Sequence, residues 1–503
     1  MNSCTQTDSY KLSHDGFMDS GTEFIYSNMT ARTFKHFPIP SYGGGYVSFG
    51  LQSTIIEFLI EDFNANFFNV ERSVAIEYLR RFFDAYLGKG NIPVDRFEKL
   101  HDLGYLPIEI KAIPEGMMIP IKVPMYTIKN THRDFAWLTN HLETVMSCET
   151  WKASTIATLI REYRVLVNEW ALKTTGSTDG TEFQLHDFSM RGMSNRFDAA
   201  KSGAAFLLSS NGTDNVPAVQ FVPDYYIDSW EDTFIGTSVP AAEHMLASLG
   251  IALVGELETM RRWITESYPN GVVSVISDTL DFFKVITEYA SELKDDILNR
   301  EPNELGLAKT VFRPDSGDPV DIICGNPNSP PGSPEHKGAV ECLWEIFGGT
   351  VTDAGYRLLH ERVGLIYGDS MNYNRISEIC RRLSEKGYAS TNIIFGIGSY
   401  TMQYMTRDTM GMAVKATAAM VNGKWYELSK DPITDSGGMK KSAKGLLRVD
   451  YDSTGNIVLY DQQTPDEESI GLLETVFLNG RITKKYSFTE IRNRLWGTDS
   501  RNP

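Results

Sequence analysis

An arginine and an aspartate stand two positions apart where a strand-like run must end, in the segment VFRPDSGDP at residues 311–319. A β-branched and aromatic run leads into Arg313 and Asp315, and the prolines and the glycine around them forbid the strand from continuing. Ligands of α/β proteins bind at the carboxyl ends of parallel strands, so this cation and this carboxylate form a candidate site. A surface turn that carries an ion pair would have the same local sequence.

Polar residues or glycines recur at the ends of other strand-like segments. Residues 271–277 end at Asp278, and residues 364–367 end at Gly368 and Asp369. Residues 392–395 end at a GIGS turn that contains Gly398 and Ser399. Helix-like segments lie between these strands, which predicts an α/β barrel or a doubly wound sheet with its functional groups on one rim.

Three further loops add groups that suit a phosphorylated sugar. Their sequences are HDFSMRG, GTD and SVPAAEH, and the last of them opens a predicted helix. Guanidinium groups bind phosphate oxygens, carboxylates accept hydrogen bonds from ribose hydroxyls or hold Mg²⁺, and glycine amides approach phosphate closely. The chain has no GxSxG elbow, which argues against a Ser-His-Asp hydrolase. The candidate residues in these loops are Phe188, Arg191, Asp214, His244 and Ser238, which is also a possible helix N-cap.

Composition places the chain among ordinary globular proteins. Its 503 residues are 42% hydrophobic and 22% charged, and its formal net charge of −17 argues against binding to nucleic acid or to an anionic membrane. We expect no secretory signal and no transmembrane segment, because the first residues lack a basic and apolar pattern and no apolar run is long enough. The five cysteines are scattered, which favours the cytoplasm over a disulfide framework or a zinc site.

The elements predict a β-rich domain built from both ends of the chain around a central α/β part. Residues 1–149 contain two amphipathic helices and a segment, 108–129, whose prolines favour short antiparallel edge strands. Residues 150–404 hold the α/β pattern, which we expect to be the catalytic domain. Residues 405–503 return to antiparallel signals, including an Asn-Gly hairpin turn, and complete the β-rich domain.

The motifs together resemble the nicotinamide phosphoribosyltransferase family. TDSYK, LPIEIKAIPEG, HDFxxRG, GTD, SVPAAEH, SVxSD, RPDSG, GD and a terminal KxYSFxEIR follow in that order across nearly the whole chain. The resemblance implies a type II phosphoribosyltransferase fold, an α/β barrel with a β-rich domain, in a homodimer that shares its active sites. It implies transfer of phosphoribose from phosphoribosyl pyrophosphate to nicotinamide with Mg²⁺, which yields nicotinamide mononucleotide and pyrophosphate for NAD salvage.

The resemblance also assigns roles to residues. Phe188 and Tyr10 of the other subunit would stack on the two faces of nicotinamide, and Asp214 would accept a hydrogen bond from its carboxamide. An aspartate would repel the carboxylate of nicotinate, so we expect nicotinamide as the substrate. The resemblance also implies contacts to phosphoribosyl pyrophosphate. Arg191 and Arg313 would lie beside the ring and phosphates, Asp315, Gly368 and Asp369 at the ribose, and Asp278 near the ribosyl and metal region. The 5′-phosphate would contact Gly398, Ser399 and Arg407, and the pyrophosphate would contact Arg32, Lys415 and Lys430.

His244 has two interpretations. A histidine early in a helix is commonly a structural hydrogen-bonding group, whereas the resemblance implies that it is phosphorylated by ATP, which would stimulate the transfer. Three positions depart from the family pattern, namely Met190 in place of a tyrosine, Asn372 in place of a carboxylate, and Ser399 within a loop that is richer in glycine in the family. These departures leave the conformation of the phosphate loop and any metal or ribose role at residue 372 open.

Three alternatives stay open at the level of the sequence. The chain could transfer phosphoribose to nicotinate, and Asp214 is the residue that discriminates between the two bases. It could be a non-catalytic binding or signalling protein with the same fold, although a decayed site would be free to lose Asp214 and His244. The third alternative is a sugar-phosphate lyase that uses a Schiff-base lysine. The sequence argues against it because no lysine stands at the end of a central predicted strand.

Overall fold

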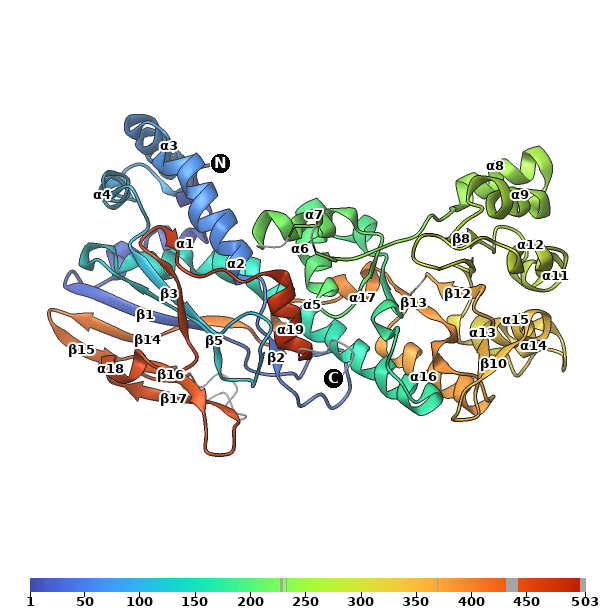
Figure 1. The fold of residues 1–503 in the computed structure, drawn as a ribbon. Coiled ribbons are helices and arrows are strands. Elements are labelled where there is room, and N and C mark those ends of the chain that lie inside the picture. Colours follow the sequence, from blue (N-terminus) through green and yellow to red (C-terminus); the bar gives the residue numbers. More distant parts are fainter. Residues whose placement is uncertain (227–228, 232, 369, 431–441, 498–503) are drawn as a thin grey trace. The chain divides into compact units, whose positions relative to one another are not determined.

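Residues 1–226, 229–231, 233–368, 370–430 and 442–497 are described by the computed structural model of the chain (Figure 1). They form two units. Unit 1 comprises Met1–Thr158, Phe221–Thr233 and Met405–Thr498, and unit 2 comprises, among the described residues, Leu159–Gln220 and Phe234–Tyr404. The chain passes from unit 1 to unit 2 inside the long helix α5 (Trp137–Thr175), whereas the sequence placed this boundary between residues 149 and 150.

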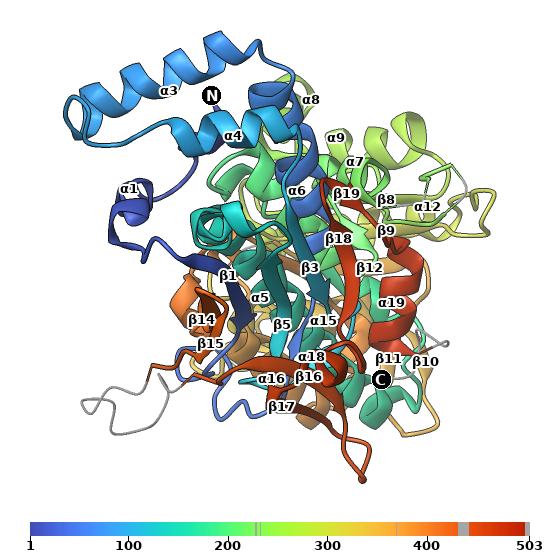
Figure 2. The same ribbon diagram turned by 90° about the vertical axis from the view of Figure 1, so that its left-hand side faces the viewer.

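Unit 1 is built on a seven-stranded antiparallel sheet to which both ends of the chain contribute (Figure 2). The N-terminal strand β1 pairs with the C-terminal strand β14, and β3 pairs with β18, so the predicted β-rich domain from two distant segments is confirmed. The predicted Asn-Gly hairpin joins β14 to β15, with positive φ at Asn422 and Gly423. In sheet order the strands are β15 (Lys424–Glu427), β14 (Ala413–Val421), β1 (Thr22–Thr30), β5 (Pro124–Asn130), β3 (Ile108–Ala112), β18 (Glu474–Leu478) and β19 (Arg481–Ile482).

The expectation of edge strands at residues 108–129 is wrong in one respect. These strands are antiparallel as predicted, but β3 and β5 lie inside the sheet, each with a neighbour on both sides. The prolines do not interrupt the hydrogen bonding because Pro114 and Pro120 lie between strands and Pro124 is the first residue of β5.

Short strand pairs and helices complete unit 1. The pairs are β2 (Tyr46–Val47) with β4 (Met118–Ile119) and β16 (Leu446–Tyr451) with β17 (Ile457–Gln463). The two predicted amphipathic helices are confirmed, the first as α2 (Leu51–Thr54) and two wider π-helical stretches that reach Phe68, and the second as α3 (Arg72–Leu87). The remaining helices are α1 (Ser9–Leu12), α4 (Asp95–Leu103), α18 (Pro465–Glu468) and α19 (Phe488–Trp496).

Unit 2 is built on six parallel strands that run in the order β7-β6-β13-β12-β9-β8. Residues 237–242 close this sheet into a barrel. On one side Thr237 exchanges backbone hydrogen bonds with Asn211 and Thr213, at 2.8 and 2.9 Å, and on the other side the backbone N–H of Ser274 donates to Pro240 at 2.8 Å. The six strands are β6 (Leu185–Asp187), β7 (Gly212–Thr213), β8 (Val272–Ile276), β9 (Lys309–Arg313), β12 (Val363–Tyr367) and β13 (Ile394–Ile397).

All carboxyl ends of these parallel strands meet at one rim of the barrel, as the sequence predicted. A small antiparallel pair, β10 (Gly349–Val351) with β11 (Arg357–Leu359), lies outside the barrel sheet. Among the described residues, no helix is both long enough and apolar enough to cross a bilayer. The helices that begin in unit 2 are α6 (Arg196–Leu207), α7 (Val216–Tyr225), α8 (His244–Val254), α9 (Glu256–Arg262), α10 (Phe282–Lys284), α11 (Ala290–Glu292), α12 (Lys294–Leu298), α13 (Pro319–Cys324), α14 (Pro334–Lys337), α15 (Ala339–Phe347), α16 (Tyr373–Glu385) and α17 (Ser399–Gln403).

A buried carboxyl group makes the stability of unit 1 dependent on pH. Burial raises the pKa of Glu115 to about 7, although its oxygens accept hydrogen bonds from the backbone of Gln52 at 2.8 Å and from the hydroxyl of Tyr226 at 3.1 Å. A carboxyl group whose pKa is raised by folding stabilises the folded state most below its unfolded pKa. That stabilisation is lost as the pH rises through the folded pKa.

We therefore expect Glu115→Gln to remove a pH dependence from the free energy of unfolding. Between pH 4.5 and pH 8, the stability of the wild-type chain should fall relative to the variant by about 3 kcal/mol, which corresponds to the shift in the pKa of Glu115. Urea unfolding of both proteins at the two pH values measures this difference, with the exposed Glu77→Gln as the control. A constant difference between wild type and variant would contradict the assignment.

Candidate functional site

A cavity of about 790 Å³ opens at the carboxyl rim of the barrel. Its lining residues follow five of the strands, namely β6, β7, β9, β12 and β13. The structure therefore brings together side chains that lie far apart in the sequence. Eight of the residues predicted from the sequence line this cavity: Phe188, Arg191, Asp214, Arg313, Asp315, Gly368, Gly398 and Ser399. Asp369 lies outside the described residues.

The ring of Phe188 is positioned by a backbone bond and by two glycines. The backbone N–H of Phe188 donates to the carbonyl of Ile397 at 2.9 Å, which fixes Phe188 against β13. A Cβ atom at Gly396 would lie 2.5 Å from the ring, and one at Gly368 would lie 3.5 Å from it. The glycines thus leave room for the ring at the strand ends, a constraint that the sequence motif alone does not reveal.

Asp187 connects the Phe188 loop to the Asp214 loop from below. It is fully buried, and burial raises the pKa of its carboxyl group. One carboxylate oxygen accepts a hydrogen bond from the N–H of Ser189 at 2.8 Å, and the other accepts from the side chain of Asn215 at 3.2 Å. The loops that carry the aromatic ring and the candidate specificity residue are therefore held together by one buried group.

Asp214 stands at the wall of the cavity with its carboxylate partly exposed. Its Oδ1 lies 2.9 Å from Nε2 of His186 and accepts a second hydrogen bond from the hydroxyl of Ser238. Burial by itself would raise the pKa of Asp214, but the hydrogen bond and charge of His186, the hydroxyl of Ser238 and the charge of Arg313 lower the pKa below its ordinary value. The site therefore keeps this residue as a carboxylate, which is an acceptor of hydrogen bonds.

Ser238 is not the N-cap that the sequence suggested. Helix α8 begins at His244 with Glu243 in the N-cap position, and Ser238 lies in the segment that closes the barrel. Because that segment is bonded to β7 on one side and β8 on the other, it is strand-like and not the first turn of a helix. The hydroxyl of Ser238 is thereby directed to Asp214.

Asp278 lies beneath the rim and links His244 to the RPDSG loop. Its side chain is 3% exposed, and its Oδ1 lies 3.0 Å from Nε2 of His244, whose side chain is 47% exposed. Its Oδ2 accepts hydrogen bonds from the N–H of Asp315 at 2.8 Å and the hydroxyl of Ser316 at 2.6 Å. Asp278 therefore orients an exposed imidazole and fixes the loop that carries Asp315.

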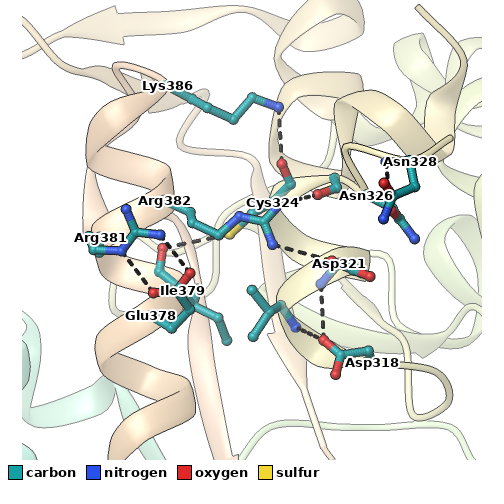
Figure 3. Close-up of polar contacts among 12 residues, drawn as sticks. Asp318, Asp321, Cys324, Asn326, Asn328, Glu378, Ile379, Arg381, Arg382 and Lys386 are labelled. Atoms are coloured by element: carbon teal, nitrogen blue, oxygen red, sulfur yellow. Dashed lines mark hydrogen bonds and ion pairs between the residues drawn. The ribbon is translucent and has the colours of Figure 1, made fainter. Parts of the chain in front are cut away.

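Arg313 and the far end of the same loop are also anchored. The Nη2 of Arg313 donates to the carbonyl of Ala242 at 2.6 Å, which ties the guanidinium to the closing segment. The loop leads into α13, which packs against α16 (Figure 3). Arg382 of α16 lies 3.2 Å from Asp321 of α13, and Lys386 donates to the carbonyl of Cys324 at 3.0 Å. These contacts hold the loop from both ends.

Five predicted site residues belong to unit 1, where four cations gather. Burial lowers the pKa of Lys415, and the charges of Arg32, Lys430 and Arg407 lower it further, while Glu143 opposes the shift. Such a concentration of positive charge on a chain of net charge −17 is suited to an anion with several negative charges. The fifth residue, Tyr10, is 59% exposed, and its segment is tied to α5 by Thr144 and Asp8.

The cavity also contains residues that the sequence analysis did not select. Arg196 adds a third guanidinium at the first position of α6, and its place shortly after the HDFSMRG motif is the signal that could have found it. Asn372, one of the departures from the family pattern, is not among the residues that line the cavity; its side chain instead caps α16 by accepting a hydrogen bond from the N–H of Arg375 at 3.0 Å. The other lining residues outside the predicted set are Met190, Met193, Asn195, Ser370 and Tyr400.

Known proteins resemble this chain over nearly its full length. Residues 183–481 match the model of the nicotinate phosphoribosyltransferase (NAPRTase) family. A nicotinamide phosphoribosyltransferase of Acinetobacter baylyi is 50% identical and covers 98% of this chain and 97% of its own, and one of Xanthomonas campestris pv. campestris is 32% identical with 97% and 96% covered. The solved nicotinate-nucleotide pyrophosphorylase from Pyrococcus furiosus superposes with a TM-score of 0.58 at 13% identity, with 99% of this chain and 95% of that chain covered, which is a likeness of fold.

Proposed function

The chain belongs to the nicotinate phosphoribosyltransferase family, and on that premise we propose that it transfers phosphoribose to nicotinamide. The family and the type II phosphoribosyltransferase fold predicted from the sequence are confirmed, and so is the prediction of an enzyme. In the proposed reaction the bond between C1 of phosphoribosyl pyrophosphate and its pyrophosphate oxygen breaks, and a bond from C1 to the pyridine nitrogen forms. The products are nicotinamide mononucleotide and pyrophosphate, as NAD salvage requires.

One observation carries the choice of base. The carboxylate of Asp214 faces the same cavity as the ring of Phe188 and is kept ionised by its neighbours. A pyridine ring stacked on Phe188 can place its carboxamide NH₂ against this carboxylate. The NH₂ then donates a hydrogen bond to the carboxylate of Asp214. Nicotinate would instead bring its own carboxylate next to the partly desolvated carboxylate of Asp214. The two negative charges would repel each other.

The residues of the cavity suit a transition state with separated charges. As pyrophosphate departs, positive charge develops at C1 and negative charge grows on the leaving oxygens. The carboxylate of Asp315 stabilises the former, and the guanidinium groups of Arg191, Arg313 and Arg196 stabilise the phosphate oxygens. The pyridine nitrogen already has a lone pair and needs no general base, so the protein contributes orientation and electrostatics.

The donor set of the site fits a Mg²⁺ that enters with the substrate. Within the described ranges, no cluster of three or more His, Cys, Asp or Glu side chains could hold a metal by itself. Mg²⁺ in such sites is commonly held by one or two carboxylates together with substrate phosphates, and Asp315 at the cavity wall can supply one. When bound, the ion neutralises charge on the departing pyrophosphate.

We also propose that ATP stimulates the transfer by phosphorylating His244. The exposed imidazole, oriented by Asp278, can accept the γ-phosphoryl group of ATP: a P–N bond forms on the ring, the P–O bond to ADP breaks, and water later cleaves the P–N bond. The support is the geometry of the His244–Asp278 pair together with the motif resemblance.

The cation cluster of unit 1 supports a shared active site in a homodimer. We assign Arg32, Lys415 and Lys430 to pyrophosphate and Tyr10 to the second face of the base, all donated by the other subunit. Arg407 is assigned to the 5′-phosphate. The other three cations lie close enough to lower the pKa of Lys415, as expected for a site that binds a polyanion. We place the enzyme in the cytoplasm, since all five cysteines are free thiols.

Gly396→Ala tests the stacking role of Phe188. The added methyl group would meet the ring at 2.5 Å and must displace it, because the other side of the position is the backbone carbonyl of Tyr367 at 2.8 Å. We expect the KM for nicotinamide to rise about tenfold and the KM for phosphoribosyl pyrophosphate to change less than twofold, from a loss of stacking of about 1 kcal/mol or more. Equal changes in both KM values would contradict the assignment. Gly43→Ala, at a position where a Cβ would have open space and the backbone has no positive φ, is the control.

The direct test of the proposed function is product formation. The purified chain is incubated with phosphoribosyl pyrophosphate, Mg²⁺ and nicotinamide, with and without ATP. We expect nicotinamide mononucleotide and pyrophosphate in a ratio of one to one, at a rate that rises with ATP. Absence of product under both conditions would favour the non-catalytic alternative, and product without any effect of ATP would remove the role proposed for His244.

A further inference from the structure

We infer that His186 is a positioning residue that determines substrate specificity by fixing the carboxylate of Asp214 for amide recognition. This inference rests on the proposed function and deepens it. Among the described residues, the carboxylate of Asp214 accepts hydrogen bonds from Nε2 of His186 at 2.9 Å and from the hydroxyl of Ser238, and both reach the same oxygen, Oδ1. Oδ2 is then the oxygen that can receive the donor of a substrate.

The imidazole of His186 is held in place by its surroundings. Its side chain is 12% exposed, and its ring centroid lies 4.9 Å from that of Phe188 at an interplanar angle of 54°. On the other side Nδ1 lies so close to Gly212 that a Cβ there would be 2.6 Å from it. The histidine is thus fixed between the ring that stacks on the base and the strand that leads to Asp214.

This placement gives His186 two effects on the site. Because Nε2 faces a carboxylate oxygen, the ring proton lies on Nε2 and is donated to Asp214. The donated bond restricts rotation of the carboxylate, so that Oδ2 stays directed for a carboxamide NH₂. It also favours the ionised form of Asp214, which is the form that repels nicotinate. Without the imidazole, the carboxylate of Asp214 would be mobile and would discriminate less between the two bases.

The test compares nicotinamide and nicotinate as substrates of His186→Leu, which removes the donor and keeps much of the volume. We expect the KM for nicotinamide to rise about 30-fold, kcat to change less than threefold, and the preference for nicotinamide over nicotinate to fall at least tenfold. His186→Gln, whose amide can still donate to Asp214, should restore most of the preference. His360→Leu replaces a histidine that precedes β12 at the other end of the barrel and should leave the preference unchanged.

A second pair of variants covers a failure of His186→Leu to fold. Asn and Gln carry the same amide, but asparagine is too short to reach Asp214, so the preference should fall in His186→Asn and persist in His186→Gln. An unchanged preference in both His186→Leu and His186→Asn would overturn the inference while the wild-type activity stands. A wild-type chain that makes no product from nicotinamide would instead overturn the proposed function, so the two failures are distinguishable.

Discussion

Asp214→Ser is expected to lower kcat/KM for nicotinamide about 100-fold and to raise the relative use of nicotinate by at least as much. Serine introduces a hydroxyl that can donate to a carboxylate, and it removes the negative charge that opposes nicotinate. A hydrogen bond to a charged group contributes about 1.5 to 3 kcal/mol, and its loss accounts for the expected decrease. Steady-state kinetics with each base in turn, at saturating phosphoribosyl pyrophosphate, measures both effects.

The control for this prediction is Asp353→Ser, which removes an exposed carboxylate from a surface turn of unit 2. It should alter neither the kcat/KM for nicotinamide nor the ratio between the two bases. If Asp214→Ser loses activity with both bases equally, the carboxylate contributes to binding in general and does not determine the choice of base.

His244→Gln is expected to abolish the effect of ATP. The variant should incorporate no label from ATP labelled at the γ-phosphate, because the nucleophilic ring nitrogen is gone, while the glutamine side chain can still donate to Asp278. The rate of phosphoribosyl transfer without ATP should stay within about threefold of the wild-type rate, since His244 has no proposed role in the bond exchange at C1. The measurement combines label incorporation with the ratio of rates with and without ATP.

An acid-labile and base-stable label identifies a phosphohistidine and separates it from phosphoserine or an acyl phosphate. His360→Gln, at the amino-terminal end of β12, is the matched histidine control and should retain both the label and the stimulation. Full labelling of His244→Gln would move the phosphorylation to another residue and refute the assignment.

The rim of the barrel could be predicted from the sequence because each strand carries its polar residue immediately after its apolar run. Arg313, Asp278 and Ser399 were found in this way, and the parallel pairing of β8, β9, β12 and β13 places them at one edge. The contribution of both chain ends to one sheet could be anticipated from the return of alternation and an Asn-Gly turn after residue 405. Strand ends and hairpin turns are determined by residues close together in the sequence, so the sequence pattern predicts them.

Features that depend on contacts between distant segments could not be predicted. Residues 237–242 read as the start of a helix, and only their pairing with β7 and β8 makes them part of the barrel and moves Ser238 to Asp214. The proximity of His186 to Asp214 likewise arises because β6 and β7 are neighbours. The interior position of β3 and β5 depends on β1 and β18, which come from opposite ends of the chain.

If Asp214 makes this site select nicotinamide over nicotinate, a direct competition between the two bases will show it. Equal concentrations of the two bases, both below their KM values, are offered to the wild-type chain with phosphoribosyl pyrophosphate and Mg²⁺, and the two mononucleotides are quantified. We expect nicotinamide mononucleotide in excess by about 100-fold or more, as a like-charge penalty of about 3 kcal/mol requires. An equal or greater yield of nicotinate mononucleotide would contradict selection by Asp214, while the family, the fold and the transferase activity would stand.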